Sequence, residues 1–206
     1  MRVAIVAQGQ SWRGYKDCDP HEVWAINSMG LRIGHDLLFA MDDLRVQEAR
    51  AAAGNESIRT LLELLRDAEF YTSTPYPEYR RAKSFPLERV TRSVGRLYFN
   101  STVAYAIGYA IDRGVTELHV YGADFTYPDA HKAEKGRACV EYLIGIAESV
   151  GIEVSVPRET TLLDSCAPPD ERVYGYDAHR VMWDGWNMSW ADKPLPTAAE
   201  IERRYG

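Results

Sequence analysis

No stretch of the sequence is apolar for long enough to cross a membrane. The longest apolar runs have the length of a β-strand, whereas a transmembrane helix needs about 20 apolar residues. The charged residue Arg2 is followed by apolar residues up to Ala7, as at the start of a signal peptide. This apolar stretch is too short for one, and polar Gln8, Gln10 and Ser11 come directly after it. We therefore expect a soluble protein with no membrane partner, and we interpret residues 2–7 as a first strand.

Cysteine pairs and an excess of positive charge are also missing. The three cysteines, Cys18, Cys139 and Cys166, are widely spaced and include no C-x-x-C pair, which excludes a disulfide framework and a Cys-based zinc site. This usage predicts a cytoplasmic protein. The net charge of −6 provides no general attraction to nucleic acid. A good share of the basic residues lies between Arg80 and Arg96, where they form either a local patch that favours a nucleic-acid acceptor or a solvated surface.

Two nucleotide-binding fingerprints are absent. The turn after residues 2–7 lacks the glycines of G-x-G-x-x-G, and no Gly-Lys-Ser/Thr of a Walker A loop occurs. The first absence argues against a dehydrogenase, and the second against a P-loop enzyme.

What the sequence does contain is a regular alternation of strand and helix patterns. With 206 residues it can form one well-buried core. The alternation predicts an α/β fold, a Rossmann-like three-layer α/β/α arrangement with a mostly parallel sheet. Strands are expected at 2–7, 22–27, 36–41, 69–74, 117–121 and 152–156, and helices at 57–66, 101–112 and 132–150.

Two segments depart from this alternation. Residues 75–99 carry three prolines and many aromatic and basic residues, which predicts a long functional loop. From residue 166 onward, tyrosines and tryptophans stand among Gly, Asp, Pro and Asn. We predict a nucleotide-binding catalytic domain at 1–165. Residues 166–206 would form an irregular aromatic arm that packs on this domain or on the partner subunit of a homodimer.

Small or polar residues follow four of the expected strands. Because ligands bind beyond the carboxyl ends of parallel strands, these residues predict a nucleotide-binding cleft. The helix expected at 101–112 begins nearby, and its free N–H groups can bind a phosphate or else be capped. The predicted cleft residues are Gln8, Gly9, Gln10, Ser11, Asn27, Ser28, Asp42, Asp43, Gly122, Asp124, Asn100, Ser101 and Thr102.

Three acidic residues and one histidine have two interpretations each. Asp42 and Asp43 can hold Mg²⁺ or Mn²⁺ on a diphosphate, or one of them can cap the next helix. Asp124 can be catalytic, or it can hold its loop by accepting backbone N–H bonds. His131, expected in a loop, can act as a base near neutral pH or be a surface histidine.

Two blocks resemble known families. Residues 100–110 (NSTVAYAIGYA) and 114–125 (GVTELHVYGADF) look like the Ser/Thr-Gly…Ala-x-x-x-Gly…Ile-x-Leu-x-Gly-x-Asp-Phe/His block of two related groups. These are the bacterial CMP-sialic-acid-dependent sialyltransferases and the motility accessory and 6-hydroxymethylpterin pyrophosphokinase-like proteins. The similarity extends over about residues 2–156.

The resemblance implies nucleotide contacts at Gly9, Gln10, Ser11 and Asn27, with donor contacts around 42–43 and 100–102. It also implies that Thr126 and Tyr127, which follow Asp124-Phe125, contact the leaving phosphate. A second phosphate-binding tyrosine of the sialyltransferases has no counterpart near His131 and Lys132. The chain is also similar in style to bacteriophage proteins, which implies that the acceptor is a hydroxymethylated base in phage DNA.

Our leading hypothesis is a glycosyltransferase that uses a nucleotide-sugar donor. His131 would be the base, Asp42 and Asp43 would hold donor hydroxyls or a divalent ion, and Tyr127 would stabilise the leaving group. The alternatives are a pyrophosphokinase-type phosphotransferase that uses ATP and Mg²⁺, and a nucleotide-binding protein without catalytic activity.

Overall fold

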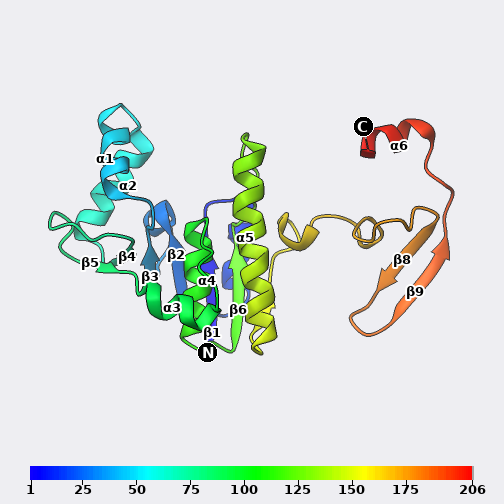
Figure 1. The fold of residues 1–206 in the computed structure, drawn as a ribbon, viewed down its shortest axis with the longest axis horizontal. Helices are drawn as coiled ribbons and strands as arrows, with labels where there is room; N and C mark the ends of the chain where they lie inside the picture. The colour runs from blue at the N-terminus through cyan, green and yellow to red at the C-terminus, as the bar shows by residue number, and fades with distance from the viewer. Residues whose placement is uncertain (206) are drawn as a thin grey trace. The chain divides into compact units, whose positions relative to one another are not determined.

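The computed structural model describes residues 1–205, in two compact units, the first Met1–Leu163 and the second from Asp164 onward. The first unit contains a seven-stranded sheet in the order β5-β4-β3-β2-β1-β6-β7, with every neighbouring pair parallel. Figure 1 shows these strands with their flanking helices. The strands are β1 (Arg2–Val6), β2 (Glu22–Ile26), β3 (Leu37–Phe39), β4 (Phe70–Thr72), β5 (Ala82–Ser84), β6 (Glu117–Tyr121) and β7 (Glu153–Ser155).

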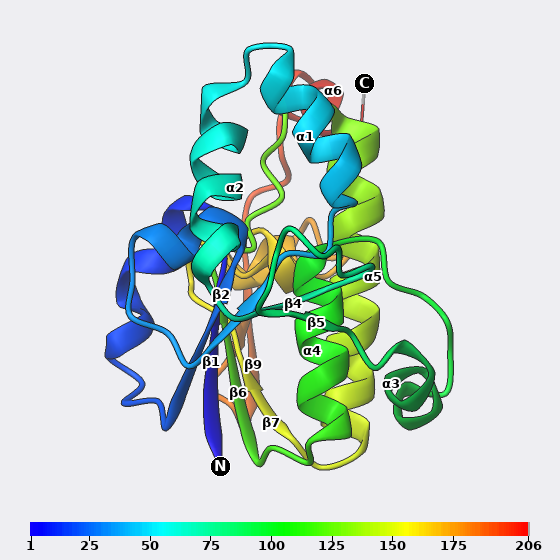
Figure 2. The same cartoon turned by 90° about the vertical axis from the view of Figure 1, so that its left-hand side faces the viewer.

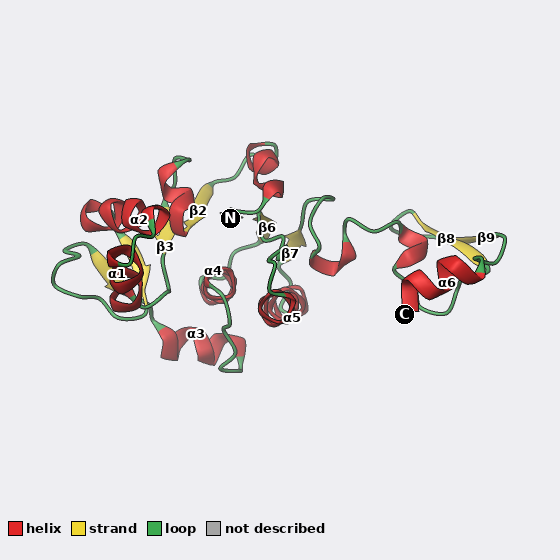
Figure 3. Cartoon of the chain, turned by 90° about the horizontal axis from the view of Figure 1, so that it is seen from above, coloured by secondary structure: helices red, strands yellow, loops and turns green. Residues whose placement is uncertain are grey.

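Helices cover both faces of this sheet, which confirms the predicted three-layer α/β/α fold. Val3 and Ile5 of β1 face a core shared with α3, α4 and α5, whereas Ala4 and Val6 face the core under α1 and α2. Figure 3 shows α3, α4 and α5 together on one side of the sheet. The helices are α1 (Leu44–Ala52), α2 (Glu56–Asp67), α3 (Leu87–Val94), α4 (Thr102–Asp112) and α5 (Ala130–Ser149), with 3₁₀ segments η1 (Gln10–Lys16), η2 (Asn27–Leu31) and η3 (Leu162–Asp164).

The segment 75–99 is more regular than the sequence predicted. It contains the edge strand β5 and the amphipathic helix α3, whose Val90 and Val94 are buried. Phe85, between these two elements, packs edge-on against Tyr105 with ring centroids 5.1 Å apart. The long functional loop predicted here is therefore largely a part of the packed fold.

The second unit also has more regular structure than the irregular arm that the sequence predicted. A hairpin of β8 (His179–Trp183) and β9 (Met188–Asp192) is followed by α6 (Ala198–Tyr205), and η4 (Pro169–Glu171) precedes both. Trp183, Trp186 and Trp190 are exposed on it. The predicted packing on the first unit or on a partner subunit stays a prediction. Among residues 1–205, no helix is long and apolar enough to span a membrane.

A buried contact joins the loops that follow the neighbouring strands β1 and β6. Asp124, only 6% exposed, accepts hydrogen bonds from the backbone N–H of Ser11 at 3.0 Å and from the Ser11 hydroxyl. The Ser11 Oγ accepts in turn from the N–H of Gly122 at 3.0 Å. Asp124 was predicted to hold a loop through backbone N–H bonds, and it does so, but the loop is the one after β1.

The same contact explains two glycines. A Cβ on Gly9 would lie 2.7 Å from the Gly122 carbonyl oxygen. Gly122 has a φ of +67°, and a Cβ on it would lie 2.1 Å from the Ala7 carbonyl oxygen. The N–H of Gly9 donates to that Gly122 oxygen at 2.8 Å. The two loops therefore approach at backbone distance, which only glycine permits.

We expect D124A to lower the free energy of unfolding by about 2–3 kcal/mol, because it leaves the buried Ser11 N–H and hydroxyl without their charged acceptor. Urea denaturation at pH 7 measures this loss. The matched control is D42N, since Asp42 is exposed and should change stability by less than about 0.5 kcal/mol. Equal stability of D124A and the wild-type protein would show that the contact does not hold the two loops.

Candidate functional site

A cleft of about 650 Å³ lies at the carboxyl edge of the sheet, lined by residues that follow β1, β2, β3 and β6. The cleft lies beside β1, where the strand order reverses: β2 to β5 follow on one side of β1, and β6 and β7 on the other. Open α/β sheets bind ligands at such a switch point. The predicted site residues that line it are Gln8, Gly9, Gln10, Asn27, Ser28, Asp42, Asn100, Ser101, Thr102, Gly122, Asp124, Thr126 and Tyr127.

Ser11, Asp43 and His131 do not line the cleft. Ser11 is buried under it, where it is bonded to Asp124. Asp43 caps α1, since its Oδ1 accepts from the N–H groups of Arg45 at 2.9 Å and Val46 at 3.3 Å. His131 lies in the first turn of α5 and not in a loop, with its side chain exposed.

The start of α4 offers hydrogen-bond donors to the cleft. Ser101 is the N-cap, and its hydroxyl accepts from the N–H of Ala104 at 3.2 Å. The N–H groups of Thr102 and Val103, in the first turn, have no acceptor within the helix. Asn100 is held in place by its backbone N–H, which donates to the Cys139 sulfur at 3.3 Å. Such a helix start attracts an anion.

Asn27 carries strain and an unused acceptor at the end of β2. It has a φ of +51°, a left-handed conformation that is uncommon for a residue other than glycine. Its Oδ1 is buried without a hydrogen-bond partner, while its Nδ2 lies 3.5 Å from Asp42 Oδ2. Phe125, another residue that lines the cleft, also has a positive φ, of +48°. Strained, unsatisfied backbone and side-chain positions of this kind concentrate at functional sites.

Asp42 and Tyr127 lie close enough for the charge of one to act on the other. Burial, and then the negative charge of Asp42, raise the pKa of Tyr127 above its usual value. The phenol therefore stays protonated at neutral pH and can donate a hydrogen bond. Lys132 places its Nζ 5.7 Å from the centre of the Tyr127 ring, a cation–π distance.

The paired-carboxylate metal site is not formed as predicted, because the Asp43 carboxylate caps α1. Among residues 1–205, no three His, Cys, Asp or Glu side chains are grouped so that they could hold a metal ion. Asp42 remains as a carboxylate on the cleft. It fits a Mg²⁺ ion that is held mainly by substrate phosphates, since this ion often takes only one or two protein carboxylates.

Sequence reasoning predicted α2, as a helix at 57–66, but missed α1 and therefore the wall that the two helices form beside the cleft. Figure 2 shows this helical hairpin rising beyond the end of the sheet opposite the N-terminus. Helix α1 was not predicted because its buried face includes the polar residue Gln47, which weakens the apolar periodicity. The cleft residues that the sequence did not single out as site residues include Gln47, Arg50, Ser57, Ile58, Leu61 and Lys132.

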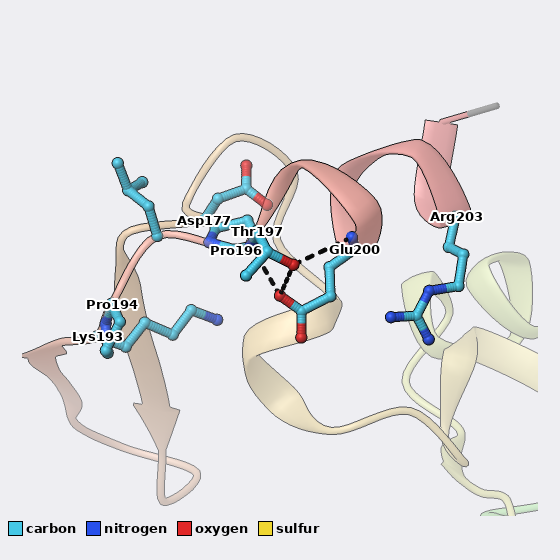
Figure 4. A pocket seen from close by; sticks show the side chains of 8 residues that line it. Asp177, Lys193, Pro194, Pro196, Thr197, Glu200 and Arg203 are labelled. Carbon is cyan, nitrogen blue, oxygen red and sulfur yellow. Dashed lines mark hydrogen bonds between the residues drawn. The ribbon is translucent and has the colours of Figure 1, made fainter.

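The second unit has a hollow of its own, of about 520 Å³. Figure 4 shows Thr197 and Glu200 turned toward each other on its wall. The Thr197 hydroxyl and N–H both donate to Glu200 Oε2 at 2.7 Å, which makes a capping box at the start of α6. These two polar side chains serve the local fold, so we place the candidate site in the first unit.

Comparison with protein-family models, with curated proteins and with solved structures gave no match to this chain.

Proposed function

We propose that this protein is a transferase that binds a nucleotide-activated donor, with a nucleotide sugar as the donor class. The observation that carries the proposal is the convergence, on one cleft, of the β1 and β6 loops, the open start of α4, and a lysine from α5. Each of these features favours a phosphorylated ligand. The cleft volume of about 650 Å³ is within the range of small-molecule and cofactor sites.

In this proposal the donor phosphate lies at the start of α4. The N–H groups of Thr102 and Val103 donate to its oxygens, and Lys132 supplies the positive charge. The nucleoside lies over the β1 and β2 loops. There Gln8 and Ser28, which are joined by a side-chain hydrogen bond, line the cleft beside Asn27.

The chemical step is a displacement at the anomeric carbon of the donor sugar. An acceptor hydroxyl oxygen forms the new bond to this carbon, while the bond from the carbon to the phosphate oxygen breaks and its electron pair leaves with the nucleotide. Lys132 and the start of α4 stabilise the charge that builds on this phosphate. Tyr127 stays protonated and donates a hydrogen bond to the same group.

We assign the acceptor's proton to Asp42. Of the two aspartates that line the cleft, Asp124 is buried and bonded to Ser11, whereas Asp42 is exposed to the cleft. His131, the base that the sequence suggested, does not line the cleft. The carboxylate of Asp42 therefore replaces it as the general base.

The basic segment from Arg80 to Arg96 gives little support to a DNA acceptor once its ion pairs are known. Lys83 pairs with Glu69 at 2.5 Å, Arg89 pairs with Asp112 at 2.8 Å, and Arg92 pairs with Glu88. Because these charges are neutralised by neighbouring carboxylates, less of the segment's charge is free for a phosphate backbone. The proposal therefore names the acceptor only as a hydroxyl compound.

We expect one family of nucleotides to raise the melting temperature of the protein in a screen of CMP, UDP, GDP, ATP and their sugar conjugates, with and without Mg²⁺. K132Q should weaken the binding of that nucleotide about tenfold, since a charge-assisted contact is lost. The matched control is K135Q, which removes the same charge from an exposed position of the same helix that does not line the cleft.

Calorimetric titration of the two variants gives the affinities. Equal Kd values for K132Q and K135Q would contradict the phosphate position. Stabilisation by ATP with Mg²⁺ alone would favour the phosphotransferase, and no stabilisation by any nucleotide would overturn the proposed function.

We expect D42N to slow the release of nucleotide from the donor sugar by at least about 100-fold, because the general base is removed. Nucleotide affinity should be retained. H131N, which alters an exposed side chain outside the cleft, should keep wild-type turnover. Chromatographic assay of nucleotide release distinguishes the two variants, and the reverse ranking of their rates would return the role of base to His131.

A further inference from the structure

We propose that the wall formed by α1 and α2 carries a second anion-binding site, centred on Arg50, and that the acceptor bound there bears a negatively charged group. This inference rests on the proposed function, in which the first anion is the nucleotide phosphate at α4 and Lys132. The chemistry of the second group is a phosphate monoester or a carboxylate, both of which an arginine binds through its planar pair of N–H donors.

Arg50 is held in a defined orientation at the edge of the cleft. Its Nη1 donates a hydrogen bond of 3.1 Å to Oε1 of Gln47, one turn earlier in α1. Gln47 is only 7% exposed and is one of the few buried polar residues of the chain. A buried amide that orients an exposed guanidinium leaves the remaining N–H donors of Arg50 for a ligand.

Two other arginines of this hairpin, Arg45 and Arg59, are used differently. Arg45 forms ion pairs with Glu48 at 2.8 Å and Glu78 at 2.9 Å, and Arg59 pairs with Glu56 at 2.7 Å. Arg50 has no carboxylate within ion-pair distance among the residues that the structure describes. It therefore keeps its positive charge available beside the cleft, whereas Arg45 and Arg59 are neutralised by neighbouring carboxylates.

The start of α2 lies beside Arg50 and adds a second attraction for an anion. Gly54, with a φ of +96°, turns the chain between the helices, and the N–H of Asn55 donates to the Arg50 carbonyl at 3.1 Å. Ser57, in the first turn of α2, lines the same cleft. Its N–H has no acceptor within the helix, so a bound anion can receive bonds from both helices.

This site is distinct from the site of the nucleotide phosphate. Helix α4 and helix α5, which carries Lys132, pack on one face of the sheet, whereas α1 and α2 pack on the other. The two cations thus approach the cleft from opposite layers. Ile58 and Leu61, on the same wall as Arg50, offer apolar contact to the body of the second substrate.

The test is a thermal-shift titration of inorganic phosphate and of malonate into protein saturated with its nucleotide. We expect R50Q to raise the half-saturating concentration of the effective anion at least about tenfold. R66Q is the matched control, because it removes the same charge from the hairpin outside the cleft. An effect of phosphate alone indicates a phosphate monoester, and an effect of malonate alone indicates a carboxylate.

Equal half-saturation in R50Q and R66Q, or no stabilisation of the wild-type protein by either anion, would overturn the second site. If no nucleotide binds, the same titration compares K132Q with K132Q/R50Q without nucleotide. Loss of the anion effect only in the double variant would then support the second site although the proposed function had failed. R50K, which keeps the charge and loses the planar pair of donors, replaces R50Q if that variant does not fold, and it should weaken binding less.

Discussion

The hydrogen bonds of Asp124 to Ser11 are the contact on which the candidate site depends. They join the loop after β6 to the loop after β1, across 113 residues of sequence. Gly9 and Gly122 let the two backbones meet at 2.8 Å. Because these contacts hold the two loops together, the residues after β1 and β6 line the same cleft. Without them, the start of α4 and Lys132 would face no fixed surface on the other side of a bound ligand.

The distribution of charge in the cleft differs from that of the whole chain. The protein carries a net charge of −6, yet Arg50 and Lys132 enter the cleft without a carboxylate partner in the described part of the chain. Of the carboxylates there, Asp124 is used by the fold and Asp42 stands open. The net negative charge thus repels polyanions from the surface, while the two cations of the cleft can still attract a small anion. This separation favours a nucleotide over nucleic acid as the ligand.

Sequence reasoning identified the sheet because its central strands are buried on both faces and are therefore apolar throughout, as β1 is. It also located most of the cleft, since the residue that follows each parallel strand must lie at the same edge. It could not identify α1, whose buried Gln47 interrupts the apolar pattern and is explained only by its bond to Arg50. Local sequence likewise did not show that His131 lies in the first turn of a helix and does not line the cleft, or that Asp43 and not Asp42 caps α1.

The most direct test of the proposed cleft is the location of the bound nucleotide, measured by amide chemical-shift changes in the isotope-labelled protein. We expect the largest changes at Gly9, Asn27, Thr102 and Lys132, which come from four separate segments and all line this cleft. Changes centred on the hollow of the second unit, around Lys193 and Arg203, or spread without a maximum over residues 1–205, would contradict it.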